Sequence, residues 1–159
     1  MPDMLVKLYE LPAHTPLVDA LAAQGITVRR AIAPEKHRIV EWVRDNFSAR
    51  WASECDVAMT GRPPGCFVAV RESGGKKELV GFACHDATCK NFFGPTGVLE
   101  SERGKGIGKA LLLATLHAMR ESGYAYAIIG GVGPAEFYAK AVGATIIEGS
   151  TPGIYKGMI

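Results

Sequence analysis

The spacing of hydrophobic residues along the chain changes between every second position and every third or fourth, and these changes predict its elements. Alternation or short apolar runs predict strands at 4–11, 26–32, 66–71, 78–84, 92–99, 124–129, 144–147 and 154–159. Helical spacing or helix-boundary residues predict helices at 34–47, 105–122 and 134–143, a helical turn or two at 16–24, and a second, less regular stretch at 49–59. This order of strands and helices predicts one mixed α/β or α+β domain.

Two of these elements carry more information than their spacing alone. The run 124–129 is almost unbroken in its apolar character, which is typical of a central strand covered on both faces. The charged positions of the helix 105–122 occupy less than half of a helical wheel, and leucine, isoleucine and alanine fill the rest. We therefore expect this helix to pack deeply against a sheet.

The composition is that of an ordinary globular chain of 159 residues, 48% hydrophobic and 21% charged. A formal net charge of +2 is too small to indicate a nucleic-acid partner. No apolar run reaches the roughly 18 residues of a membrane-spanning helix, and charges interrupt the N-terminus where a signal peptide would be continuously apolar. We expect a cytoplasmic protein without membrane contact, whose four cysteines are free thiols.

The segment 98–110, Val-Leu-Glu-Ser-Glu-Arg-Gly-Lys-Gly-Ile-Gly-Lys-Ala, passes from a predicted strand through three glycines into a helix. A Walker A loop would need a glycine where Arg103 stands, and a dinucleotide fingerprint would need one at Lys109. What remains is an Arg-Gly-x-Gly-x-Gly turn at a helix N-terminus. Its glycines, free amides, helix dipole and cations favour an anion with several charges, such as a pyrophosphate.

Residues 103–108 resemble the acetyl-CoA motif of the GNAT superfamily of N-acetyltransferases, and residues 137–144 resemble its second motif. The second motif, usually F-Y-x-K-x-G-F, has one inserted residue here and Ala144 in place of the last phenylalanine. The resemblance implies a GNAT-like fold, with a mixed, mostly antiparallel central sheet that is splayed at the cofactor slot and flanked by helices. Residues 26–159 would form the acetyltransferase domain, and residues 1–25 a strand–helix extension packed on it.

The same resemblance implies where acetyl-CoA, the cosubstrate, would bind. The main chain of Thr96, Gly97 and Val98 would pair with the pantetheine arm. The pyrophosphate would lie on the glycine turn, formed by Arg103, Gly104, Lys105, Gly106, Ile107 and Gly108, with Lys109 at its edge. Gly94-Pro95 interrupts the preceding strand and is compatible with a bulge there, since proline cannot donate to a ladder.

Tyr138 matches the position of the family's general acid. A phenol with an ordinary pKa of about 10 is a suitable proton donor for a departing thiolate whose pKa is about 8.5. Phe137, one residue earlier, points elsewhere on the helix and is expected in the core.

The resemblance does not identify the base that would remove the proton of an amine acceptor. Many family members carry a glutamate on the strand before the glycine turn, but residues 92–99 contain no acidic residue. We predict Glu54 as the base because it lies near Trp42 and Trp51, which would add an aromatic wall for an ammonium group. Asp56 and the pair His85 and Asp86 remain as alternatives, while Glu100 is close to the turn.

The sequence thus predicts an N-acetyltransferase that moves an acetyl group from acetyl-CoA to a small-molecule primary amine by direct attack in a ternary complex. An amino sugar, a polyamine or an amino acid derivative would be a suitable acceptor. The alternatives are acetylation of a protein amine and a non-catalytic sensor that binds acyl-CoA.

Two further expectations concern metals and partners. Cys84, His85 and Cys89 could ligate zinc, with Cys66 joining across the hairpin, but no second pair completes four ligands, so no metal is expected. The N-terminal strand could pair with a second copy of the chain and form a homodimer.

Overall fold

The computed structural model describes the whole chain, residues 1–159, and contains one seven-stranded sheet. The strand order is β2-β3-β4-β5-β6-β1-β7, and every neighbouring pair is antiparallel except β5–β6. The strands are β1 (Met4–Lys7), β2 (Ile26–Arg30), β3 (Cys66–Ser73), β4 (Lys76–His85), β5 (Phe92–Val98), β6 (Tyr126–Ile129) and β7 (Thr145–Ile146). The helices are α1 (Thr15–Ala22), α2 (Lys36–Asn46), α3 (Ala49–Met59), α4 (Ile107–Glu121) and α5 (Ala135–Val142). The predicted mixed fold, mostly antiparallel, is confirmed.

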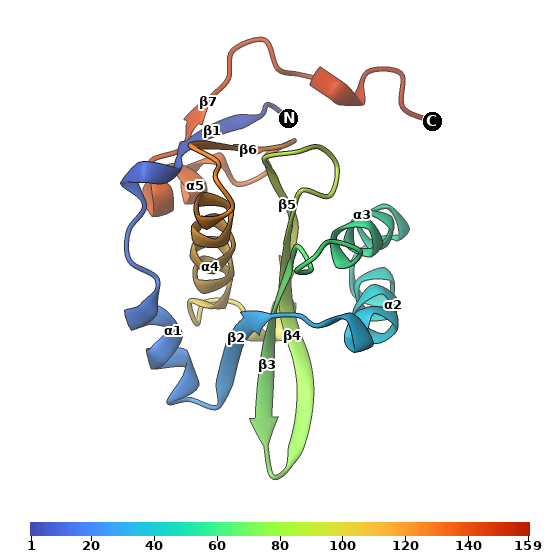
Figure 1. Cartoon of the computed structure of the whole chain (residues 1–159), viewed down its shortest axis with the longest axis vertical. Coiled ribbons are helices and arrows are strands. Elements are labelled where there is room, and N and C mark those ends of the chain that lie inside the picture. The colour runs from blue at the N-terminus through green and yellow to red at the C-terminus, as the bar shows by residue number, and fades with distance from the viewer.

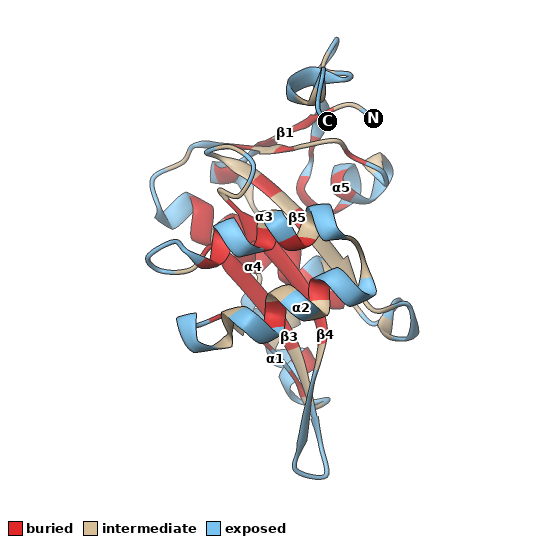
Figure 2. Ribbon diagram, turned by 90° about the vertical axis from the view of Figure 1, so that its right-hand side faces the viewer, coloured by how far each residue is buried: buried red, intermediate tan, exposed pale blue.

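Helices cover both faces of the sheet (Figure 1). Helices α1 and α4 lie on one face, with α5 beside α4, while α2 and α3 lie on the other. The larger core lies between α4 and the sheet, where Leu111, Leu113 and Leu116 are fully or almost fully buried. The smaller core lies beneath α2 and α3, as Figure 2 shows from that side. The predicted deep packing of the helix that follows the glycines is confirmed.

The sheet opens between β5 and β6. The two strands pair only at Phe92–Ile128 and Phe93–Ile129, and β5 then continues to Val98 without β6 beside it. The register between β4 and β5 shifts between Ala83 and His85, so Gly94 and Pro95 form a bulge where Gly94 adopts a φ of +122°. Both the bulge and the splayed sheet agree with the prediction.

The N-terminal strand β1 lies inside the sheet, because it pairs with β6 on one side and with β7 on the other. Its side chains at Met4 and Val6 belong to the larger core. The Asp3 carboxylate also accepts a hydrogen bond from the Gly131 amide at 2.8 Å. Since both sides of β1 are paired, it offers no free edge to a second copy, and a homodimer stays an untested prediction.

Three sequence-based expectations were wrong in detail. Residues 154–159 form no strand: Gly153–Tyr155 is a 3-10 turn, and Gly157 reverses the chain with a φ of +79°. The strand predicted from residue 124 begins at Tyr126, a residue that is 44% exposed, so β6 is not covered on both faces. Strand β1 ends at Lys7, and the 3-10 turn Leu8–Glu10 follows it.

None of the helices is both long enough and apolar enough to span a membrane.

Candidate functional site

The glycine turn stands at the N-terminus of α4, next to the open side of β5. Gly104 and Gly106 adopt φ values of +80° and +86°, which residues other than glycine rarely adopt. The first hydrogen bond of α4 runs from the Ala110 amide to the Gly106 carbonyl. The six amides from Gly104 to Lys109 donate to no group of the protein. They form a concentrated set of free donors at the positive end of a helix dipole.

The cations around this turn differ in their partners. The Lys105 ammonium donates to the Glu102 carboxylate at 2.8 Å, and Arg71 makes two further hydrogen bonds with the same carboxylate. Hydrogen bonds from Arg71 and then Lys105 lower the pKa of Glu102. Arg103 and Lys109 are exposed and make no ion pair within the protein. An anion at the turn would therefore meet two unpaired cations.

The third glycine of the turn, Gly108, has no structural need to be glycine. Its φ is not positive, and a Cβ added there would lie 3.7 Å from a Val98 methyl group, an ordinary contact. Replacing Gly108 with Ala should therefore stabilise α4 by about 0.5–1 kcal/mol, the usual difference in helix propensity. Replacing Gly106 with Ala should instead destabilise the protein by about 1–2 kcal/mol, because an L-residue is strained at its φ of +86°.

Urea unfolding of the two variants beside the parent chain measures both effects. Equal shifts of the unfolding midpoint, or shifts of the same sign, would contradict this account of the turn.

The backbone of β5 presents free donors to the opening in the sheet. The Leu99 amide donates to the Val80 carbonyl on β4, so the alternate amide at Val98 points to the opposite, open side. The ring of Phe47 lies against Gly97, where an added Cβ would come within 2.6 Å of two ring carbons. Phe47 in turn belongs to an aromatic group with Trp42, Trp51 and Phe82. The predicted aromatic wall thus packs against β5 at Gly97.

Tyr138 lies on α5 at the point where β5 and β6 separate. Its ring packs edge-on against Phe93 with centroids 6.3 Å apart, and only 7% of the residue is exposed. Phe137 is 39% exposed, so the expectation that it belongs to the core was wrong. Burial raises the pKa of Tyr138 to about 12, and its hydroxyl makes no hydrogen bond within the protein. The phenol therefore holds its proton more tightly than a free tyrosine does, and no protein group competes for that proton.

The raised pKa of Tyr138 predicts a pH dependence of stability. The ordinary value of a tyrosine is about 10, so the folded state favours the protonated phenol. This stabilisation is fully present below about pH 10 and is lost as the pH rises through about 12. The unfolding free energies of the parent chain and of Tyr138→Phe should keep a constant difference up to about pH 10 and change relative to one another only above it. A divergence that begins near neutral pH would contradict this assignment.

Glu54 lies on α3 and faces the loop between β4 and β5. Its carboxylate accepts a hydrogen bond from the Thr88 hydroxyl, and it lies near Tyr155 of the C-terminal turn. Burial first, and then the nearby carboxylates of Glu54 and Asp3, raise the pKa of Tyr155. The Tyr155 hydroxyl is 3.0 Å from the position that a Cβ on Gly130 would occupy, beside the ring of Phe92. The C-terminal segment therefore returns to the start of the opening and brings a phenol next to Glu54.

The alternative bases have different surroundings. Asp56 forms an ion pair with Lys36 at 2.9 Å, with both side chains about half exposed. Nδ1 of His85 lies 2.7 Å from the Asp86 carboxylate, which also accepts hydrogen bonds from the Tyr124 hydroxyl and the Asn91 amide, both at 2.8 Å.

Burial would raise the pKa of Asp86, but its three hydrogen bonds together outweigh burial and hold it below its usual value. His85 itself is only 6% exposed, and its Nε2 is buried without a partner. The hydrogen bonds that Asp86 makes across the β4–β5 loop are not visible in the sequence, because Tyr124 lies 38 residues away.

Cys84, His85 and Cys89, which the sequence offered as possible zinc ligands, do not form a cluster. Cys84 instead lies with Cys55 and Cys66, and their three sulfurs are within 4.8 Å of one another. The sequence held no signal for Cys55 in this group, because only the packing of α3 on the sheet brings it there.

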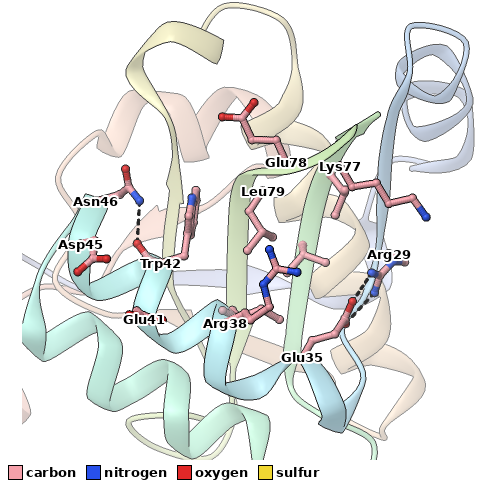
Figure 3. Close-up of a pocket in the computed structure, with 13 residues that line it drawn as sticks. Arg29, Glu35, Arg38, Glu41, Trp42, Asp45, Asn46, Lys77, Glu78 and Leu79 are labelled. Carbon is pink, nitrogen blue, oxygen red and sulfur yellow. Dashed lines mark hydrogen bonds and ion pairs between the residues drawn. The ribbon is translucent and has the colours of Figure 1, made fainter. Parts of the chain in front are cut away.

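A cavity of about 440 Å³ lies away from the glycine turn, between α2 and strands β2 to β4 (Figure 3). The Arg29 guanidinium bonds the Glu35 carboxylate on one side of it, and Asn46 donates to the Trp42 carbonyl at 2.9 Å on the other. Of the residues predicted for the site, only Trp42 lines this cavity. Its walls carry charges of both signs and do not by themselves indicate a ligand.

The sheet thus opens between two parallel strands, beside a glycine turn that begins a buried helix. The chain belongs to the acetyltransferase (GNAT) family, whose model matches residues 36–143.

Solved structures agree with this fold. A GCN5-related glucosamine N-acetyltransferase region of a fungal multi-domain GH3 β-N-acetylglucosaminidase is 14% identical over 92% of this chain and 19% of its own, with a TM-score of 0.72. A GCN5-related N-acetyltransferase from Sphaerobacter thermophilus is 23% identical over 92% of this chain and 48% of its own, with a TM-score of 0.68. A GCN5-related N-acetyltransferase from Kribbella flavida is 18% identical over 91% of this chain and 53% of its own, with a TM-score of 0.53.

This chain therefore spans at most about half the length of these three solved structures. Among curated proteins, none matches its sequence.

Proposed function

We propose that this protein transfers an acetyl group from acetyl-CoA to the primary amine of a small molecule. The observation that carries the proposal is the set of six unpaired amides from Gly104 to Lys109 beside the open side of β5. A pyrophosphate with two negative charges fits donors that converge at a helix N-terminus, with Arg103 and Lys109 unpaired beside them. The free edge of β5 from Thr96 to Val98 is suited to hydrogen bonding with the amides of a pantetheine arm.

In the proposed reaction the amine attacks the thioester carbonyl directly, with both substrates bound together. The new C–N bond forms as the C–S bond breaks, and the departing thiolate takes the proton of the Tyr138 hydroxyl. The Val98 amide, which points to the open side of β5, would donate to the oxyanion that develops on the carbonyl oxygen. Tyr138 has no competing hydrogen bond within the protein, which supports its role as the donor.

Glu54 is the proposed acceptor of the amine's proton. An alkyl ammonium with a pKa near 10.4 is almost wholly protonated at neutral pH, so the reaction needs a base. Glu54 makes its one hydrogen bond to a neutral hydroxyl, whereas Asp56 is already paired with a lysine. The carboxylates of Glu54 and Asp3 near Tyr155 also favour a cationic acceptor, such as an amino sugar, a polyamine or an amino acid derivative.

Calorimetric titration with acetyl-CoA tests the cosubstrate first, with adenosine 3′,5′-bisphosphate as a ligand that lacks the pantetheine arm. We expect saturable binding of one acetyl-CoA per chain, weakened when Arg103 and Lys109 are both replaced by Ala. A folded protein that binds no acetyl-CoA would overturn the proposal.

A screen of amines that measures release of free CoA thiol then tests turnover. Turnover with small amines supports the proposed acceptor class, and turnover with peptide amines alone would favour a protein substrate. Tight binding of acetyl-CoA without turnover of either class would favour the non-catalytic sensor.

A further inference from the structure

Three cysteines from three different elements meet in the smaller core. Cys55 lies on α3, Cys66 begins β3, and Cys84 lies directly opposite Cys66 on β4. All three are fully buried, and each sulfur lies within 4.8 Å of the other two. Three sulfurs bound to one central atom at about 2.3 Å, the length of a zinc–thiolate bond, would be about 4 Å apart. The spacing therefore fits a single shared atom with only small movements.

The cluster offers three ligands and no fourth. No histidine or carboxylate joins the group, and Cys89 lies outside it in the β4–β5 loop, partly exposed. The other side chains of this core are apolar, among them Ala31, Ala52 and Val68. Structural zinc sites are almost always tetrahedral with four protein ligands, so the set is one ligand short for zinc.

The charge around the cluster limits what it can bind. Three thiolates leave a net charge of −1 with a divalent ion and −2 with copper(I), and burying such a charge without a counter-ion is costly. The two carboxylates that act on the thiols, Asp56 on Cys55 and Glu35 on Cys66, are themselves paired with Lys36 and Arg29. No lysine or arginine acts on any of the three thiols, so an anionic complex would have no counter-ion beside it. A complex without net charge is therefore strongly favoured over an anionic one.

We propose that Cys55, Cys66 and Cys84 form a binding site for trivalent arsenic, taken up as arsenite. Three As–S bonds form and three As–OH bonds break. Each thiol proton leaves with a hydroxide as water, so that no atom changes its oxidation state. The product carries no net charge, as the surroundings require. This inference does not depend on the proposed acetyl transfer.

The three thiols lie in contact with one another and are closed off from solvent. Because the sulfurs are fully buried, arsenic enters when α3 opens locally or while the chain folds. Once bound, it joins α3 to β3 and β4 and stabilises the folded state.

The test refolds the reduced full-length chain in the presence of sodium arsenite and removes the excess by gel filtration. We expect native mass spectrometry to show one arsenic per chain, X-ray absorption to show three sulfur neighbours, and the melting temperature to rise. Cys89→Ala, which removes the one cysteine outside the cluster, should behave as the parent chain does. Cys66→Ala should lose the retained arsenic.

The X-ray absorption measurement uses the parent chain, so it decides the question even if Cys66→Ala does not fold. Fewer than three sulfur neighbours, or loss of arsenic from Cys89→Ala, would overturn the proposal. Retention of zinc or copper(I) in preference to arsenic would also overturn it, because the charge of the core would then not control binding.

Discussion

Replacing Tyr138 with Phe is expected to lower kcat for acetyl transfer by about 10²- to 10⁴-fold, the usual contribution of a general acid. The ring would keep its packing against Phe93, so only the hydroxyl is lost. Because that hydroxyl makes no hydrogen bond within the protein, its removal leaves no unpaired partner behind. The affinity for acetyl-CoA and the unfolding free energy should therefore change little. Steady-state kinetics, calorimetric titration and urea unfolding together measure the three quantities.

Tyr126→Phe is the matched control, because it removes a phenolic hydroxyl from an exposed residue of β6. We expect it to leave kcat unchanged. A Tyr138→Phe variant as active as this control would show that the thiolate receives its proton from another group. A parallel loss of stability and activity would instead indicate a structural role for the hydroxyl.

Phe82→Ala should destabilise the protein by about 3–5 kcal/mol, the cost of removing a large aromatic side chain from a packed core. Phe82 is fully buried on β4, with the rings of Trp42 and Trp51 each 6.1 Å away and that of Phe47 at 5.5 Å. These three rings come from α2, α3 and the connection between them. Removal of Phe82 therefore opens a cavity beneath the whole helical cover of this face.

Denaturant unfolding with a linear extrapolation measures this loss. Val57→Ala, at an exposed position of α3, is the control and should change stability by less than about 0.5 kcal/mol. A loss below about 1 kcal/mol for Phe82→Ala would mean that α2 and α3 repack easily on the sheet. In that case Phe47 would not be held firmly against Gly97.

The sequence determined the features that depend on neighbouring residues. Its local pattern located the helices α2, α4 and α5 and seven of the eight predicted strands, and it marked α1 and α3 less clearly, because burial of one face leaves its spacing within each element. The glycines at 104 and 106 marked the turn, since their backbone conformations exclude other residues. Gly94-Pro95 likewise marked the bulge, because a proline cannot continue the ladder. The tail 154–159 misled the prediction because apolar residues there lie between two turn-forming glycines.

Only the tertiary structure decided which distant residues meet. It placed β1 between β6 and β7, although these three strands lie far apart in the chain. It brought Tyr155 and Thr88 to Glu54, and it joined Cys55 to Cys66 and Cys84 while leaving Cys89 outside. Nor does spacing along α5 show that Tyr138 is buried and Phe137 exposed. Each of these outcomes depends on contacts between elements that are distant in the chain. The order of residues within a single element does not determine such contacts.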